Sequence, residues 1–169
     1  PYAERSKVQR KALGLPLFTD AGCSEVTTFI QSGDVVFGAP AELARRLPEV
    51  AARRIRERFG FDSPVVLRTA DELAAVVRTN PFLEPGADNG PLHVMFLADE
   101  PSPDAVARLD PQRSPGDSFA VRGREIYLRC PAGAARTRLT NGYFDAALGT
   151  TSTSRNWRTV LKLLELAGG

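Results

Sequence analysis

Residues 92–97 read Leu-His-Val-Met-Phe-Leu, a run of apolar residues around a single histidine. A short apolar segment of this length, preceded by a loop rich in glycine and proline, predicts a buried β-strand. Downstream of it the sequence predicts a short helix over 102–109 and a hairpin that turns at Arg122-Gly123-Arg124. Helical segments over 139–148 and 153–167 follow. The second half of the chain therefore has the order strand, helix, strand, strand, helix.

The first half of the chain repeats this order approximately. Residues 1–3 have the character of the start of a strand, and the apolar spacing over 13–21 predicts a helix that ends at Gly22. Residues 26–30 are β-branched and aromatic, and a tight turn separates them from a return strand over 35–37. A helical stretch over 41–58, divided into two pieces at Pro48, leads to a strand over 64–68. Thr69 and Glu72 then have the spacing of a capping box, which predicts the start of another helix.

The order strand, helix, strand, strand, helix, strand is that of ferredoxin-like folds. We therefore predict an α+β protein with two ferredoxin-like (α-β plait) subdomains and mainly antiparallel sheets. The first subdomain is expected over 1–70 and the second, with a C-terminal helix, over 91–169. A connecting helix and loop are expected over 71–90.

The composition is that of a globular protein without extreme features. The chain has 169 residues, of which 43% are hydrophobic and 25% charged, and its net charge is +2. These values exclude a collagen, a disordered acidic tail and a disulfide scaffold. No apolar run is long enough for a membrane span and no secretory signal is visible, so we expect a cytoplasmic protein that does not enter the membrane.

The sequence contains few residues typical of metal or nucleophilic sites. Cys23 and Cys130 are far apart and are expected to be reduced, and His93 is the only histidine. A histidine-rich metal site is therefore excluded, and we expect no metal and no cofactor. We interpret His93 as a residue of the sheet, and Gln31 and Ser32 as parts of a turn. The chain lacks a P-loop and a G-x-S-x-G nucleophile elbow, so no catalytic residue can be assigned.

The strongest candidate site lies within residues 136–158. Five consecutive hydroxyl residues, 150–154, precede the last predicted helix, and one of them is expected to be its N-cap. Free backbone N–H groups and the helix dipole attract anions at such an end. Arginines one turn apart on that helix, together with two upstream arginines, would complete the pocket. The predicted anion-binding residues are Arg136, Arg138, Asn141, Thr153, Ser154, Arg155, Asn156 and Arg158.

A purely structural interpretation of the same segment stays open. The hydroxyl residues would then only cap a solvated, basic helix end, and Trp157 would belong to the core. The excess of 19 arginines over 3 lysines has two interpretations as well, genomic composition or recognition of planar anions.

Several motifs in the sequence resemble those of the bacterial domain-of-unknown-function 1697 family. The hairpin Phe29-Ile-Gln-Ser-Gly-Asp-Val-Val-Phe37 is similar to a family motif, with Asp34 where asparagine is usual. The segment Arg138-Leu-Thr-Asn-Gly-Tyr-Phe-Asp145 and the segment 153–163 resemble its C-terminal signature. The family's usual Arg-Gly-Ile-Asn-Val-Gly-Gly loop is absent between Ala3 and Lys7. The resemblance implies a ferredoxin-like fold of two subdomains and no agreed activity, cofactor or catalytic residue.

Three functions are compatible with these observations. The first is a binding module for a phosphorylated or otherwise anionic ligand; the net charge of +2 argues against strong nucleic-acid binding. The second is a small-molecule enzyme with its site in a cleft between the subdomains. In that case Arg138 and Arg155 would hold an anion and Tyr143 or Asp145 would transfer a proton. The third is a homodimeric interaction protein that associates through sheet edges.

Overall fold

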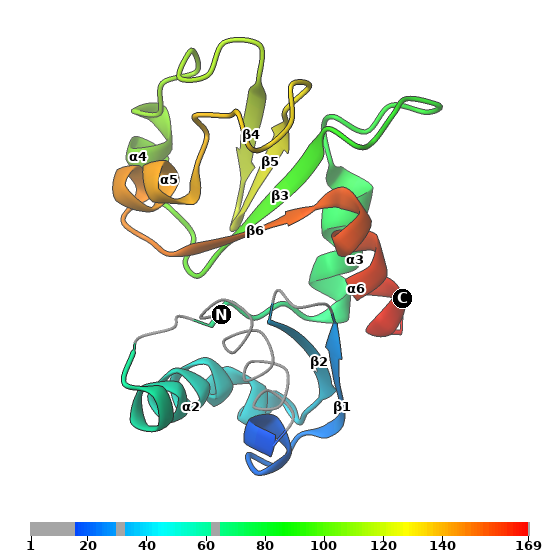
Figure 1. Cartoon of the computed structure of the whole chain (residues 1–169), viewed down its shortest axis with the longest axis vertical. Coiled ribbons are helices and arrows are strands. Elements are labelled where there is room, and N and C mark those ends of the chain that lie inside the picture. Colours follow the sequence, from blue (N-terminus) through cyan, green and yellow to red (C-terminus); the bar gives the residue numbers. More distant parts are fainter. Residues whose placement is uncertain (1–15, 30–32, 62–64, 169) are drawn as a thin grey trace, which may run out of the picture. The chain divides into compact units, whose positions relative to one another are not determined.

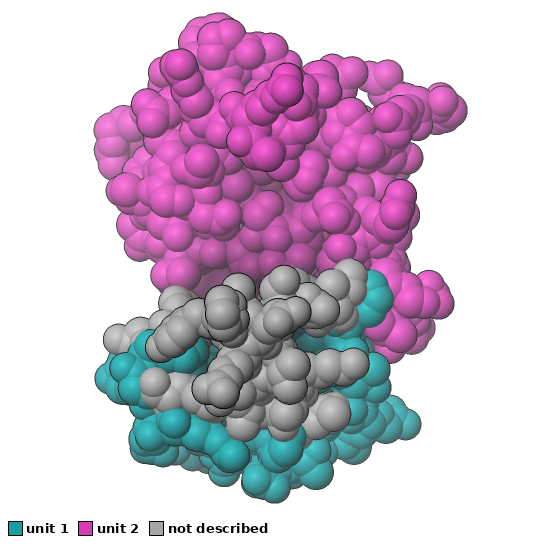
Figure 2. Space-filling view, viewed as in Figure 1, with its two compact units in different colours: residues 1–65 teal, residues 66–169 magenta. Residues whose placement is uncertain are grey.

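The fold was obtained as a computed structural model, and it describes residues 16–29, 33–61 and 65–168, apart from the side chain of residue 59. The chain forms two compact units, unit 1 over Pro1–Val65 and unit 2 over Val66–Gly169 (Figures 1 and 2). We describe each unit by itself. Helices and antiparallel sheets are present in both, which confirms the predicted α+β class.

Unit 2 contains a four-stranded, fully antiparallel sheet with the strand order β4-β5-β3-β6 (Figure 1). Along the chain its elements follow the order β3-α4-β4-β5-α5-β6, and α3 and α6 flank it. The first five elements follow the order predicted for this half, whereas β6 replaces the start of the last predicted helix. The strands are β3 (Leu92–Leu97), β4 (Ser118–Arg122), β5 (Glu125–Arg129) and β6 (Ser152–Asn156). The helices are α3 (Ala70–Thr79), α4 (Pro103–Ala107), α5 (Asn141–Leu148) and α6 (Trp157–Leu166).

The sheet of unit 2 is buried on both faces because its central strands are apolar at almost every position. Met95 and Leu97 of β3 join a core cluster with residues of α4 and α5, including Phe144. Successive side chains of a strand point to opposite faces, so Val94 and Phe96 lie on the other side. There α6 packs against β3 and β6, and α3 packs against α6 (Figure 1). Two helices therefore cover each face.

Unit 1 contains one long helix and one hairpin within its described residues. Helix α2 (Ala41–Phe59) runs without interruption through Pro48, so the predicted division into two pieces is wrong. Leu47 and Ala51, on either side of that proline, are fully buried, and their packing holds the helix together. Strands β1 (Ser24–Phe29) and β2 (Asp34–Gly38) pair antiparallel, and the rings of Phe18 and Phe37 stack at 5.1 Å.

The structure departs from two further sequence predictions. Residues 65–69 belong to no strand, so the strand predicted over 64–68 is wrong in its described part. The described residues of unit 1 accordingly hold a two-stranded sheet rather than a four-stranded plait. The last helix begins at Trp157 rather than at Thr153, because residues 152–156 pair with β3 as the edge strand β6. The expected family loop near Ala3 lies outside the described residues, as do Gln31 and Ser32.

Candidate functional site

Several polar residues of the predicted site segment contact one another inside unit 2. Thr140 is the N-cap of α5 and accepts a hydrogen bond from the Tyr143 N–H at 3.2 Å. Asn141 donates to the Ser152 hydroxyl at 2.7 Å, and that hydroxyl donates to the Asp145 carboxylate at 2.6 Å. This chain of contacts ties the first turns of α5 to the start of β6. It occupies Asn141, one of the residues predicted to bind an anion, and Asp145, one of the two candidates for proton transfer.

The end of β6 and the start of α6 correct the expected helix cap. Asn156 is the N-cap of α6 and accepts from the Thr159 N–H at 2.8 Å, so no residue of 150–154 has this role. Arg155 lies in the strand, where its guanidinium donates to the Thr153 hydroxyl and to the Ser154 carbonyl. Arg155 and Arg158 are therefore not one turn apart on a common helix.

The strand register separates several of the predicted site residues. Thr153 and Arg155 are opposite Phe96 and Val94 of β3 and share their face of the sheet, whereas Ser154 is opposite Met95 and shares the other face. Arg136, Arg138 and Arg158 are exposed. The structure thus brings Asn141 together with Ser152, and Arg155 with Thr153. Anion binding by this segment stays a prediction.

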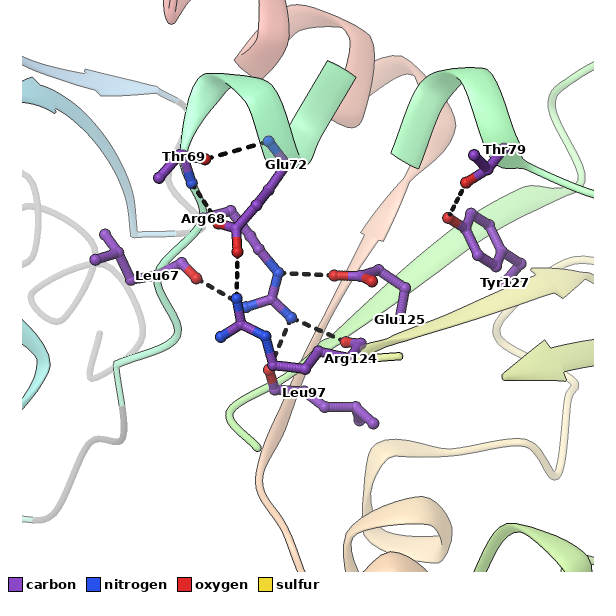
Figure 3. Close-up of polar contacts among 9 residues, drawn as sticks. All are labelled: Leu67, Arg68, Thr69, Glu72, Thr79, Leu97, Arg124, Glu125 and Tyr127. Atoms are coloured by element: carbon purple, nitrogen blue, oxygen red, sulfur yellow. Dashed lines mark hydrogen bonds and ion pairs between the residues drawn. The ribbon is translucent and has the colours of Figure 1, made fainter. Parts of the chain in front are cut away.

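A different polar cluster lies where the chain enters unit 2, and it is centred on Arg68 (Figure 3). The side chain of Arg68 is only 5% exposed, and its Nε donates to the Glu125 carboxylate at 2.8 Å. Its two terminal nitrogens donate to three carbonyl oxygens at 2.7–2.9 Å; these belong to Leu67, Leu97 and Arg124. The guanidinium also lies 5.5 Å from the centre of the Phe96 ring. This arginine therefore fastens residues 67–68 to the end of β3 and to the β4–β5 turn.

Helix α3 begins beside this cluster. The Thr69 hydroxyl accepts from the Glu72 N–H at 3.2 Å, and the Glu72 carboxylate accepts from the Thr69 N–H at 2.7 Å. The predicted capping box is thus confirmed. The second oxygen of Glu72 forms an ion pair with Arg124 from the β4–β5 turn (Figure 3). One glutamate therefore both caps the helix and holds the turn.

A small, half-open pocket of about 160 Å³ lies between α3 and the β4–β5 hairpin. Arg122, at the end of β4, lines the pocket and donates to the Thr79 carbonyl at the end of α3, at 2.6 Å. Within the described residues no carboxylate lies within 4 Å of the Arg122 guanidinium. The lining residues are Glu72, Ala75, Val76, Thr79, Arg122, Arg124, Glu125 and Tyr127.

Tyr127 forms the floor of this pocket. Its ring is buried, and its hydroxyl shares a hydrogen bond of 3.0 Å with the Thr79 hydroxyl (Figure 3). Burial raises the pKa of Tyr127, and the Glu125 charge adds to this, while the Thr79 hydrogen bond and the Arg122 charge oppose it. The phenol is therefore neutral near pH 7 and can donate one hydrogen bond.

The pocket combines cationic donors with a neutral hydroxyl, a set that suits a small anionic group. Among the described residues no group of three or more histidine, cysteine, aspartate or glutamate side chains could hold a metal ion. No helix within the described ranges has the length and apolar character needed to cross a bilayer. No sequence pattern marks this pocket, because α3 and the hairpin that form it are about fifty residues apart.

Fold and site together define an α+β protein of two units with a small, arginine-lined pocket in the second one. A family model for proteins of unknown function, DUF1697, matches residues 3–127, and the chain belongs to this family. The match includes α3, the hairpin and the pocket residues up to Tyr127, whereas the motifs at 138–163 lie outside the matched range. No curated protein and no solved structure matches the chain.

Proposed function

We propose that the protein is a binding module for a small anionic ligand, which binds in the pocket between α3 and the β4–β5 hairpin. The observation that carries this proposal is that Arg122 lines the pocket, with no carboxylate within 4 Å of its guanidinium among the described residues. Phosphate and carboxylate groups are the partners that a guanidinium binds best, because its planar N–H donors match their oxygen atoms.

The charges around the pocket support an anion rather than a cation. Glu72 is paired with Arg124, and Glu125 is paired with Arg68. Each carboxylate is therefore compensated, and the charge of Arg122 remains in excess. Its guanidinium has five N–H donors, and the contact with the Thr79 carbonyl occupies one end of it.

The size of the pocket restricts what the ligand can place there. Pockets that enclose a whole drug-sized ligand usually measure about 300–1,000 Å³. The volume of about 160 Å³ suits one anionic group of a ligand, with the remainder of the molecule outside. Of the functions that the sequence left open, the enzyme and nucleic-acid alternatives stay predictions.

Binding can be tested by titrating the ¹⁵N-labelled protein with inorganic phosphate, and separately with acetate, at constant ionic strength. We expect saturable shifts of the Arg122, Arg124 and Tyr127 amides, and at least a tenfold weaker affinity in Arg122→Gln, because charged hydrogen bonds contribute about 1.5–3 kcal/mol. Arg158→Gln is the matched control, because Arg158 is an exposed arginine of the segment predicted from the sequence.

The control also separates the two candidate sites. If Arg158→Gln weakens binding while Arg122→Gln does not, the segment 136–158 is the site and the pocket is not. If neither anion shifts any amide of the pocket saturably, the proposed function is wrong.

A further inference from the structure

Among the residues that the structure describes, strand β4 is an edge of the unit 2 sheet, and β5 is its only neighbour there (Figure 1). An edge strand presents backbone N–H and C=O groups that have no partner in the sheet, and proteins usually protect such an edge with lysine, proline or a bulge. The sequence of β4 is Ser-Phe-Ala-Val-Arg, and its register with β5 runs without a shift. Strand β4 has no lysine, proline or bulge, and its one charged residue, Arg122, stands at the end of the strand.

The register identifies which backbone groups of β4 point outward. The Leu97 N–H donates to the Arg124 carbonyl and the Cys130 N–H to the Pro91 carbonyl, so even-numbered residues of β5 face β3. The odd-numbered residues Glu125, Tyr127 and Arg129 then bond to β4, where their partners are Arg122, Ala120 and Ser118.

It follows that the backbone groups of Phe119 and Val121, which alternate with these partners, are directed to the open side of β4. In the part of the chain that is described, neither residue makes a backbone hydrogen bond outside the ladder.

We propose that two copies of the chain associate by antiparallel pairing of their β4 strands about a twofold axis at Ala120. In this register Phe119 of one copy is opposite Val121 of the other, and each such pair exchanges two backbone hydrogen bonds. The result is a continuous sheet of eight strands, in the strand order β6-β3-β5-β4 continued by the same strands of the second copy in reverse.

The side chains of β4 are complementary to themselves in this register. Phe119 and Val121 pack against the core cluster from one face and remain partly exposed, so pairing would cover them further. An aromatic residue opposite a β-branched one is a favourable cross-strand pair. Arg122 would be opposite Ser118, so no like charges meet. Ala120 would be opposite itself in the closely spaced type of pair, where its small side chain allows the strands to approach.

The other edge of the sheet does not have these properties. Strand β6 carries Ser-Thr-Ser-Arg-Asn, with a charged residue inside the strand and no apolar side chain. Edge charges of this kind prevent pairing. Pairing is therefore expected at β4 and not at β6. Because β4 is complementary to itself in the antiparallel register, a second copy of the chain is the partner that this edge favours.

The test uses a pair of opposite charges at the axis. Ala120→Lys and Ala120→Asp each place like charges side by side only in the dimer, so each variant alone should dissociate about tenfold or more readily than the wild type in sedimentation equilibrium. An equimolar mixture of the two variants should dimerise again, because lysine then meets aspartate. Ser154→Lys on β6 is the matched control and should leave the dimer intact. Circular dichroism checks that each variant is folded.

Val121→Pro provides an independent variant, because it removes an outward N–H without removing a hydrogen bond of the β4–β5 ladder. It too should dissociate the dimer. A wild type that sediments as a monomer up to about 1 mM overturns the proposal. A dimer that survives both Ala120 variants, or that Ser154→Lys dissociates, also overturns it, because the contact would then lie on another surface.

Discussion

Replacing Arg68 with methionine should destabilise unit 2 strongly, because it removes the guanidinium and retains most of the side-chain volume. Four hydrogen bonds are lost, one to the Glu125 carboxylate and three to carbonyl oxygens. Removing one partner of a buried ion pair costs about 3–5 kcal/mol, since the other charge stays without compensation. Glu125 is 17% exposed and can regain some water, so we expect the lower end of this range, about 3 kcal/mol.

The loss can be measured by urea unfolding followed through tryptophan fluorescence. Trp157 is the only tryptophan of the chain, and it is buried in unit 2, so its signal reports on this unit even if the two units unfold separately. Arg124→Met is the matched control. Its ion pair with Glu72 is about one-third exposed on both sides, so its loss should cost less than about 1 kcal/mol.

A double variant tests the physical reason for the loss. In Arg68→Met/Glu125→Gln the uncompensated charge is gone, and part of the lost stability should return. The reasoning is refuted if Arg68→Met lowers the free energy of unfolding by less than about 1 kcal/mol. It is also refuted if adding Glu125→Gln to Arg68→Met destabilises the protein further, by the full amount expected for an independent substitution.

Three further predictions concern the same unit. Thr69→Ala removes the helix cap of α3 and should lower the free energy of unfolding by about 1 kcal/mol in the same urea assay. Ser152→Ala should lower the free energy of unfolding by about 1–3 kcal/mol, because it leaves Asn141 and Asp145 without their shared hydroxyl. Ser154→Ala, two residues further along the same strand, is its control. The raised pKa of Tyr127 means that the folded state holds the phenolic proton more tightly than the unfolded state does. The contribution of the protonated phenol to stability is therefore complete below the ordinary pKa of 10.0 and is lost as the pH rises above it. Tyr127→Phe should therefore reduce the loss of stability as the pH rises above about 10, and an unchanged pH dependence would contradict this assignment.

Features with a local cause could be predicted from the sequence. The capping box at Thr69 and the apolar strand over 92–97 are both where the sequence places them, since a cap needs only residues three apart and a buried strand needs only an apolar run. The turn at Gly123 is similarly local, and its positive φ of 57° explains the glycine.

Features that depend on distant partners were missed. The hydroxyl-rich stretch before Trp157 has the composition of a helix cap, but its pairing with β3, about sixty residues earlier in the chain, makes it a strand. The stretch ending at Arg68 has the composition of a strand, yet it makes no strand pairing, and side-chain bonds from Arg68 hold it instead. The pocket was missed for the same reason, because its walls come from α3 and from a hairpin that only the tertiary fold brings together.

The location of Arg68 has a practical consequence for anyone who wishes to produce the C-terminal half alone. A fragment that starts at residue 71, just after the first subdomain predicted from the sequence, would lack both this arginine and the threonine that caps α3. One that starts at residue 66 keeps them, together with the carbonyl of Leu67. The shorter fragment should be recovered aggregated or degraded and the longer one intact, although they differ by only a handful of amino acids at one end.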